Sequence, residues 1–177
     1  MTAPYLHERP AELVIGVDPG KSGAIAVLDR QGRLYDVHDM PVVGPIISPV
    51  LLGELVHNWI DPFSLPPYGT AVIEDVHAMP KQGVSSVFSF GRSLGVAEGV
   101  MAGEGLAIAY VSPARWKRGM GLSADKGVSR RRAIEQWPHM GKAFARVKDD
   151  GRAEAALIAL WWIRNELVGA LPEDPRT

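Results

Sequence analysis

Apolar residues along this chain gather into short unbroken runs separated by turn-forming residues. Three runs are six or seven residues long and apolar almost throughout, which is typical of strands buried on both faces: 12–18, 70–76 and 106–111. Two more runs, 23–29 and 34–40, flank the turn-forming pair Gln31-Gly32. Together with 12–18 they predict an antiparallel meander.

Longer segments repeat their apolar residues at helical spacing. They predict helices over 50–60, 85–102, 125–137 and 151–166, with a loop over 41–49. The second of these helices also has a glycine at every fourth position: Gly91, Gly95, Gly99 and Gly103. An interior glycine costs a helix about 1 kcal/mol. The row therefore indicates a close approach to another backbone, either the sheet or a partner helix.

The order of these elements predicts a single α/β domain, with a five-stranded mixed sheet and helices on both faces. A length of 177 residues fits one domain. We expect the folded domain to span 12–168, between a flexible N-terminal extension at 1–11 and a flexible tail at 169–177.

The composition excludes several classes of site. The chain has no cysteine, which rules out disulfides, thiolate metal sites, iron–sulfur clusters and cysteine nucleophiles. Its N-terminus has no apolar signal core, and no apolar run approaches the roughly 20 residues of a membrane-spanning helix. We therefore expect a cytoplasmic protein with no membrane partner.

Positive charge is concentrated in one part of the chain. The net charge is only −1, yet the segment from Arg115 to Arg152 carries +7 and the remainder −8. Such a concentration is typical of a surface that binds a polyanion, although a solvated helix face gives the same pattern. The basic side chains that we expect to contact nucleic acid are Lys117, Arg118, Lys126, Arg130, Arg131 and Arg132.

Two carboxylates lie in strands that are otherwise apolar. Asp18 ends the first strand before Pro19-Gly20, a position where a turn-capping aspartate is also frequent. Glu74 stands in the middle of an apolar strand, and an unpaired buried charge costs several kcal/mol. We therefore expect Glu74 to meet a metal ion, with a structural ion pair as the alternative.

Further carboxylates open the last predicted helix. Asp150 is well placed as its N-cap, and Glu154 shares the face that continues as Leu157 and Trp161. Carboxylates from the first strand, the fourth strand and this helix could converge at one end of the sheet. An oxygen-only cluster favours Mg²⁺ or Mn²⁺. Two such ions about 4 Å apart are the usual arrangement for attack of water on a phosphodiester.

The order and spacing of these motifs resemble the RuvC family of Holliday junction endonucleases, and most closely its bacteriophage-type members. The resemblance covers about residues 13–165 and rests on IGVDPG at 15–20, SGA at 22–24, VIEDV at 72–76, FGRSLG at 90–95, ADK at 124–126 and DDGRAEA at 149–155. It implies an RNase H-like fold, a homodimer, and a location in a bacterial cell or a phage-infected host. It also implies Mg²⁺-dependent cleavage of four-way or other branched DNA, leaving 5′-phosphate and 3′-hydroxyl ends.

The resemblance further implies a catalytic site that holds two Mg²⁺ ions, for which Mn²⁺ can substitute. Its metal ligands would be Asp18, Glu74, Asp150 and Glu154. The common bacterial pattern places the last two ligands three residues apart, whereas Asp150 and Glu154 are four apart. Asp149 therefore stays an alternative ligand.

The same resemblance assigns roles near the DNA. Lys126 matches a catalytic basic residue close to the scissile phosphate, and Lys117 is a second candidate for that role. His77 falls where relatives carry an aromatic side chain that stacks on opened bases, although a lone histidine is more often structural.

Other functions fit parts of the sequence. Asp-x-Gly turns also open actin-like sugar kinases and ATPases, but those proteins need two lobes and a far longer chain. An RNA-processing nuclease of the related ribosomal-RNA-maturation family would share much of the metal site, and a non-catalytic DNA-junction-binding module would share the fold. The basic segment and the glycine-rich helix favour DNA junctions, and the carboxylates favour catalysis.

Overall fold

A five-stranded sheet forms the centre of the protein in the computed structural model, which describes residues 13–60, 69–76, 83–123 and 125–167. Its strand order is β3-β2-β1-β6-β7. The strands are β1 (Leu13–Asp18), β2 (Ala24–Leu28), β3 (Leu34–Asp39), β6 (Gly69–Glu74) and β7 (Ala107–Val111). β1, β2 and β3 form the predicted antiparallel meander, and the parallel pairs β1–β6 and β6–β7 complete the mixed sheet.

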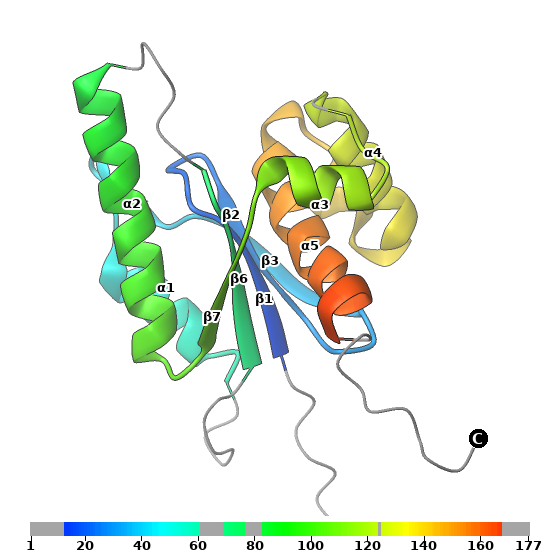
Figure 1. Ribbon diagram of the computed structural model, residues 1–177, viewed down its shortest axis with the longest axis horizontal. Helices are drawn as coiled ribbons and strands as arrows, with labels where there is room; N and C mark the ends of the chain where they lie inside the picture. The colour runs from blue at the N-terminus through cyan, green and yellow to red at the C-terminus, as the bar shows by residue number, and fades with distance from the viewer. Residues whose placement is uncertain (1–12, 61–68, 77–82, 124, 168–177) are drawn as a thin grey trace, which may run out of the picture.

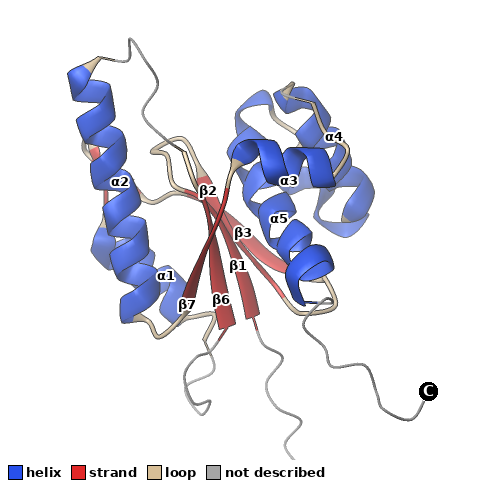
Figure 2. Ribbon diagram, in the orientation of Figure 1, coloured by secondary structure: helices blue, strands red, loops and turns tan. Residues whose placement is uncertain are grey.

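Helices cover both faces of this sheet (Figure 1). One face carries α1 (Pro49–His57) and α2 (Val84–Gly103). The other carries α5 (Asp150–Trp162), with α3 (Pro113–Gly119) and α4 (Lys126–Gln136) beside it. Two 3-10 turns, Pro138–Phe144 and Val147–Asp149, connect α4 to α5, and a π-helical turn, Ile163–Leu167, follows α5. Figure 2 shows the resulting three layers, in agreement with the predicted α/β architecture.

Alternation along β1 divides the core into two halves. Ile15 and Val17 pack in the cluster that includes α1 and α2, whereas Val14 packs in the cluster that includes α5. Gly16 lies on the α5 face, because successive side chains of a strand point to opposite faces. A Cβ added at Gly16 would overlap the backbone oxygen of Ala155. The glycine therefore lets α5 lie directly on the central strand.

The glycine row of α2 does not pack on the sheet. A Cβ added at Gly91, Gly95, Gly99 or Gly103 would meet no atom of the described residues within 4 Å. The buried residues of α2 are Ser93, Ala97 and Met101. Of the two contacts that the sequence left open for the glycine row, the one with the sheet is therefore wrong.

Two segments differ from the sequence-based prediction. The predicted loop at 41–49 contains a small hairpin of β4 (Val42–Val43) and β5 (Ile46–Ile47). No element was predicted for the segment that forms α3, because seven residues are too few to display helical periodicity. Pro113 in its first turn is a recognised helix-start signal that was available in the sequence.

The predicted N-terminal extension and C-terminal tail lie outside the described residues. Within the ranges that the structure does describe, no helix is both long and apolar enough to cross a membrane.

Candidate active site

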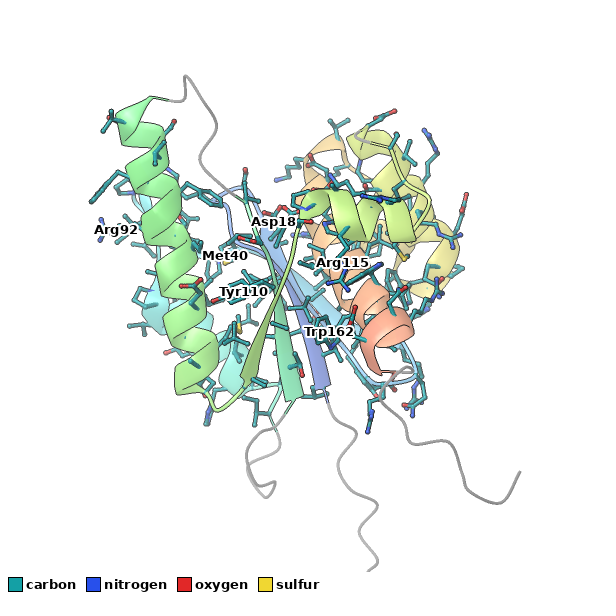
Figure 3. All side chains as sticks on the ribbon, viewed as in Figure 1. Asp18, Met40, Arg92, Tyr110, Arg115 and Trp162 are labelled. Carbon is teal, nitrogen blue, oxygen red and sulfur yellow. The ribbon has the colours of Figure 1, made fainter. Side chains whose placement is uncertain are left out.

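Two neighbouring strands bring a carboxylate to the same edge of the sheet. β1 and β6 are parallel and pair Val17 with Ile73, so the next residues, Asp18 and Glu74, lie at adjacent strand ends. Ile73 packs under α1 and α2, and alternation therefore turns Glu74 toward α5. Asp18 faces the same layer, because it follows Val17 on β1. Figure 3 shows Asp18 at this end of the sheet.

Glycines bring the turn after Asp18 into contact with the start of α5. A Cβ at Gly23 would overlap the backbone oxygen of Asp18 and would lie 2.8 Å from its carboxyl carbon. A Cβ at Gly151 would lie 2.8 Å from the backbone oxygen of Ser22. These close approaches place the first turn of α5, which contains Asp150, against the turn that follows Asp18.

Glu74 is buried, with only 7% of its surface exposed. The indole Nε1–H of Trp116 donates a hydrogen bond of 2.7 Å to its Oε1. Trp116 is fully buried and lies on α3, directly after the edge strand β7. The hydrogen bond to Glu74 thus comes from a neutral side chain, whereas the sequence led us to expect a metal or an ion-pair partner.

Glu154 reaches the same region from α5. It is 5% exposed, as expected for a residue on the core-facing side of the helix. The Nζ of Lys117 on α3 lies 2.8 Å from its Oε1, and the hydroxyl of Ser129 on α4 lies 3.5 Å from the same oxygen. Three helices therefore meet at this carboxylate.

The electrostatic environment of Glu74 shows that these groups act on one another. The pKa of Glu74 is raised from its ordinary 4.5 to about 7, chiefly by burial and in addition by the negative charges of Asp18 and Glu154. The hydrogen bond from Trp116 and the positive charge of Lys117 oppose this shift in pKa. Asp18, Glu74, Glu154 and Lys117 thus form one electrostatic cluster, which we call the carboxylate site.

Asp149 is held by a different partner. Its carboxylate accepts a 2.8 Å hydrogen bond from the backbone N–H of Arg146 and a 2.7 Å bond from the guanidinium of the same residue. Although burial acts to raise it, these bonds hold the pKa of Asp149 below its ordinary value. Asp149 also occupies the N-cap position of α5. The prediction that Asp150 is the N-cap is therefore wrong, because the Arg146–Asp149 turn closes first and Asp150 becomes the first helical residue.

A hard divalent cation fits the chemistry of the carboxylate site, because the converging donors are all carboxylate oxygens. The positions of these carboxylates in the structure differ from those of a complete set of metal ligands. Among the residues that the structure describes, no three Asp, Glu or His side chains are placed to hold an ion together. The ammonium of Lys117 lies beside Glu154.

The predicted nucleic-acid contacts lie at different distances from this site. Lys117 is part of it, and Arg118 is exposed on the same helix. On α4, Arg131 is exposed, whereas Arg130 and Arg132 are half-buried. His77 and the side chain of Lys126 lie outside what the structure describes.

An open groove of about 640 Å³ lies beside the turn that follows Asp18. It separates this turn from the first half of α2. The described residues that line it carry several hydroxyl groups and no acidic side chain. The lining residues are Gly20, Lys21, Ser22, Ser85, Ser86, Ser89, Phe90 and Ser93. Three of these residues, Gly20, Lys21 and Ser22, follow Asp18 by two to four positions in the chain.

Trp116 contacts the carboxylate site but was not predicted from the sequence, and the same is true of Ser129. Trp116 follows Ser112-Pro113 in the segment without a predicted element, and nothing in its local sequence points to Glu74. The only available signal was the helix-start pattern at Pro113, which would have placed Trp116 and Lys117 on one short helix.

Solved structures share this fold. A Thermus thermophilus RuvC in complex with a Holliday junction substrate aligns with a TM-score of 0.60 at 16% identity, over 86% of this chain and 95% of that chain. Another T. thermophilus RuvC structure aligns with a TM-score of 0.56 at 15% identity, over 86% of this chain and 95% of that chain. The yeast mitochondrial Holliday junction resolvase Ydc2 aligns with a TM-score of 0.51 at 15% identity, over 88% of this chain and 79% of that chain.

No protein-family model and no curated protein matches the sequence. At sequence identities of 15–16%, the structural similarity supports the fold alone. The predicted RNase H-like architecture, a mixed five-stranded sheet flanked by helices as in RuvC, is therefore confirmed.

Proposed function

We propose that this protein is a metal-dependent, structure-selective endodeoxyribonuclease that resolves Holliday junctions or other branched DNA by paired nicks. The observation that carries the proposal is the convergence of Asp18, Glu74 and Glu154 on one face of a RuvC-like sheet. The motifs at 15–20, 72–76 and 149–155 support membership of the RuvC family and its bacteriophage-type branch.

In this proposal Asp18, Glu74, Asp150 and Glu154 hold two Mg²⁺ ions, which Mn²⁺ can replace. Asp150 is preferred to Asp149 because Arg146 already binds the Asp149 carboxylate. Bound ions of this kind lower the pKa of an attacking water and stabilise charge on the phosphate. The products would carry 5′-phosphate and 3′-hydroxyl ends.

Lys117 has two successive partners in this mechanism. In the structure its ammonium lies 2.8 Å from Oε1 of Glu154. If a metal ion bound Glu154, the ammonium of Lys117 would be available to bind the scissile phosphate, a role that Lys126 at the start of α4 would share. Arg118 and the arginines of α4 would hold more distant phosphates of the same DNA, and the groove beside Asp18 would admit a DNA strand.

The homodimer would form through the glycine row of α2. That row is open to close approach, and Phe88 at the start of the same helix leaves 72% of its surface exposed. A two-fold dimer would present two carboxylate sites to a junction that itself has two-fold symmetry, which accounts for paired nicks.

The test is a gel assay of the purified protein with Mg²⁺ on four-way, three-way, flap and linear DNA and on a structured RNA. We expect nicking of the branched DNAs first. Asp18→Asn or Glu74→Gln should reduce nicking about a thousand-fold and leave junction binding intact, because metal-ion stabilisation is worth several kcal/mol and each 1.36 kcal/mol is ten-fold.

Three results would overturn parts of this proposal. Cleavage that persists in either variant would remove the metal-site assignment. Preferential cleavage of the RNA would favour the ribosomal-RNA-processing alternative, and binding without any cleavage would favour a non-catalytic module. A fully active Glu154→Gln beside an inactive Asp150→Asn would reassign the fourth ligand to Asp149.

A further inference from the structure

Trp116 is the largest fully buried side chain of the described chain, and its indole lies at the edge of the carboxylate site. Its Nε1–H donates to Glu74 Oε1 over 2.7 Å. The Nζ of Lys117 lies 5.1 Å from the centre of its ring. The indole therefore touches one carboxylate directly and contacts the cation that holds another.

A buried indole N–H needs an acceptor wherever it lies, and Trp137 shows the ordinary solution. Trp137 is also buried, and its Nε1–H donates over 3.0 Å to the backbone oxygen of Gly32. A backbone oxygen is fixed by the chain itself, so that bond serves packing alone. The bond from Trp116 instead ends on a flexible side chain, and it restricts where that side chain can go.

We propose that Trp116 is a positioning residue for the carboxylate site: its indole N–H holds Oε1 of Glu74 and leaves Oε2 as the oxygen available to a metal ion. This inference rests on the proposed function. Hydrogen bonds from outside the ligand set orient ligating side chains, and their loss typically costs 10–100-fold in metal affinity.

The position of α3 explains how such a contact arises. The helix begins directly after β7, whose Val111 pairs with Glu74 in the sheet. Its first turns therefore stand over the end of β6. Trp116 and Lys117 are successive residues of this helix, and they bind Oε1 of Glu74 and Oε1 of Glu154 respectively. A helix of seven residues thus controls two carboxylates that come from different elements.

The experiment is a Mn²⁺ titration of the full chain by isothermal calorimetry, with no DNA present. Trp116→Phe keeps a buried aromatic ring and removes the N–H donor. We expect it to weaken Mn²⁺ binding at least about ten-fold. Trp137→Phe is the matched control, because it removes a buried indole N–H away from the site, and it should bind Mn²⁺ like the wild type.

The outcomes separate this inference from the proposed function. Wild-type protein that binds no Mn²⁺ overturns the proposed metal site and the role of Trp116 with it. Wild-type protein that binds Mn²⁺, together with equal affinity in Trp116→Phe, overturns the role of Trp116 alone. Equal weakening in both Trp variants also overturns it, because the effect would then reflect packing.

A second measurement keeps the test decisive if Trp116→Phe does not fold. In the indole N–H spectrum of the ¹⁵N-labelled protein, the Trp116 resonance is the one that moves in Glu74→Gln. We expect that resonance to shift as Mg²⁺ saturates the unsubstituted protein. If Glu74→Gln leaves the indole N–H spectrum unchanged, the proposal is overturned. It is also overturned if the Trp116 resonance does not shift at saturating Mg²⁺.

Discussion

The helices α5 and α2 lie on opposite faces of the sheet and both are rich in small residues, but only α5 uses them inside the chain. Residues Ala153 to Ala159 of α5 are buried, and the helix lies so close to β1 that a Cβ at Gly16 would overlap a backbone oxygen of Ala155. On α2, Cβ atoms added to the glycine row would lie more than 4 Å from every atom in the part of the chain that the structure describes.

This difference shows that the same sequence feature marks two kinds of contact. On α5 the small residues complete an interface within the chain, and they bring Glu154 to the ends of β1 and β6. On α2 the small residues lie on an exposed surface, where each glycine costs helix stability without a packing gain in this chain. A partner helix would provide that gain, so we interpret the row as half of an interface between two chains.

The largest predicted effect is on the α5 side. Gly16→Ala should lower the free energy of unfolding by about 3 kcal/mol, because overpacking a contact with backbone costs at the upper end of the usual range. Urea unfolding followed by circular dichroism measures it. A loss below about 1 kcal/mol would mean that α5 can lift from β1, and the two helices would then differ less than the structure indicates.

On the α2 side, a bulky charge should act on association rather than folding. We expect Gly95→Glu to weaken the proposed dimer about a hundred-fold, roughly 2.7 kcal/mol, with little change in the unfolding of the monomer. Sedimentation velocity over a concentration series measures this. Val50→Glu on the exposed surface of α1 is the control and should leave association unchanged. A wild-type protein that stays monomeric contradicts the interpretation of the glycine row.

The carboxylate site makes the α5 side sensitive to pH. The pKa of Glu74 is raised to about 7 in the folded protein, above its ordinary 4.5. Between these two pH values the folded state therefore holds a proton that the unfolded state has released. The contribution of Glu74 to stability is therefore complete below pH 4.5 and is lost as the pH rises through 7. Glu74→Gln should remove this loss, so the stability of the variant relative to wild type should increase by roughly 2 kcal/mol as the pH rises from 5 to 8 in EDTA.

Urea unfolding at several pH values tests this prediction. Glu98→Gln is the control on α2, where Glu98 accepts a 2.9 Å hydrogen bond from the exposed Tyr110. It should follow the wild-type pH profile. A Glu74→Gln profile parallel to wild type would show that burial of Glu74 carries no pH-dependent cost.

The smallest predicted effect is on the stability of α2, and it tests whether the glycine row is free of contacts within one chain, unlike α5. Gly99→Ala should raise the stability of the monomer by up to about 1 kcal/mol, because alanine is the better helix former and its Cβ meets open space. Thermal unfolding at concentrations below dimerisation measures it. Destabilisation by this variant would mean that the row already packs within one chain.

Much of the fold and part of the site could be predicted from the sequence. Continuous apolar runs and the turn at Gln31-Gly32 located the five main strands. Burial on both faces explains the apolar runs of β1, β2 and β6. The prediction of burial on both faces is wrong for β7, an edge strand that is partly exposed. Glu74 was identifiable as a charge where the pattern requires an apolar residue. Glu154 followed from helical spacing, which put it on the buried face of α5.

The sequence by itself thus determined the layers, the strand that carries each carboxylate and the face of α5 that carries Glu154, because periodicity is a local property of the chain. Only the tertiary structure decided which groups meet. Trp116 binds Glu74 across 42 positions of sequence, Lys117 rather than a neighbour pairs with Glu154, and Arg146 takes Asp149. It also decided that the glycines of α2 face outward. Such contacts depend on how distant segments cross in space, and local patterns contain no information about that crossing.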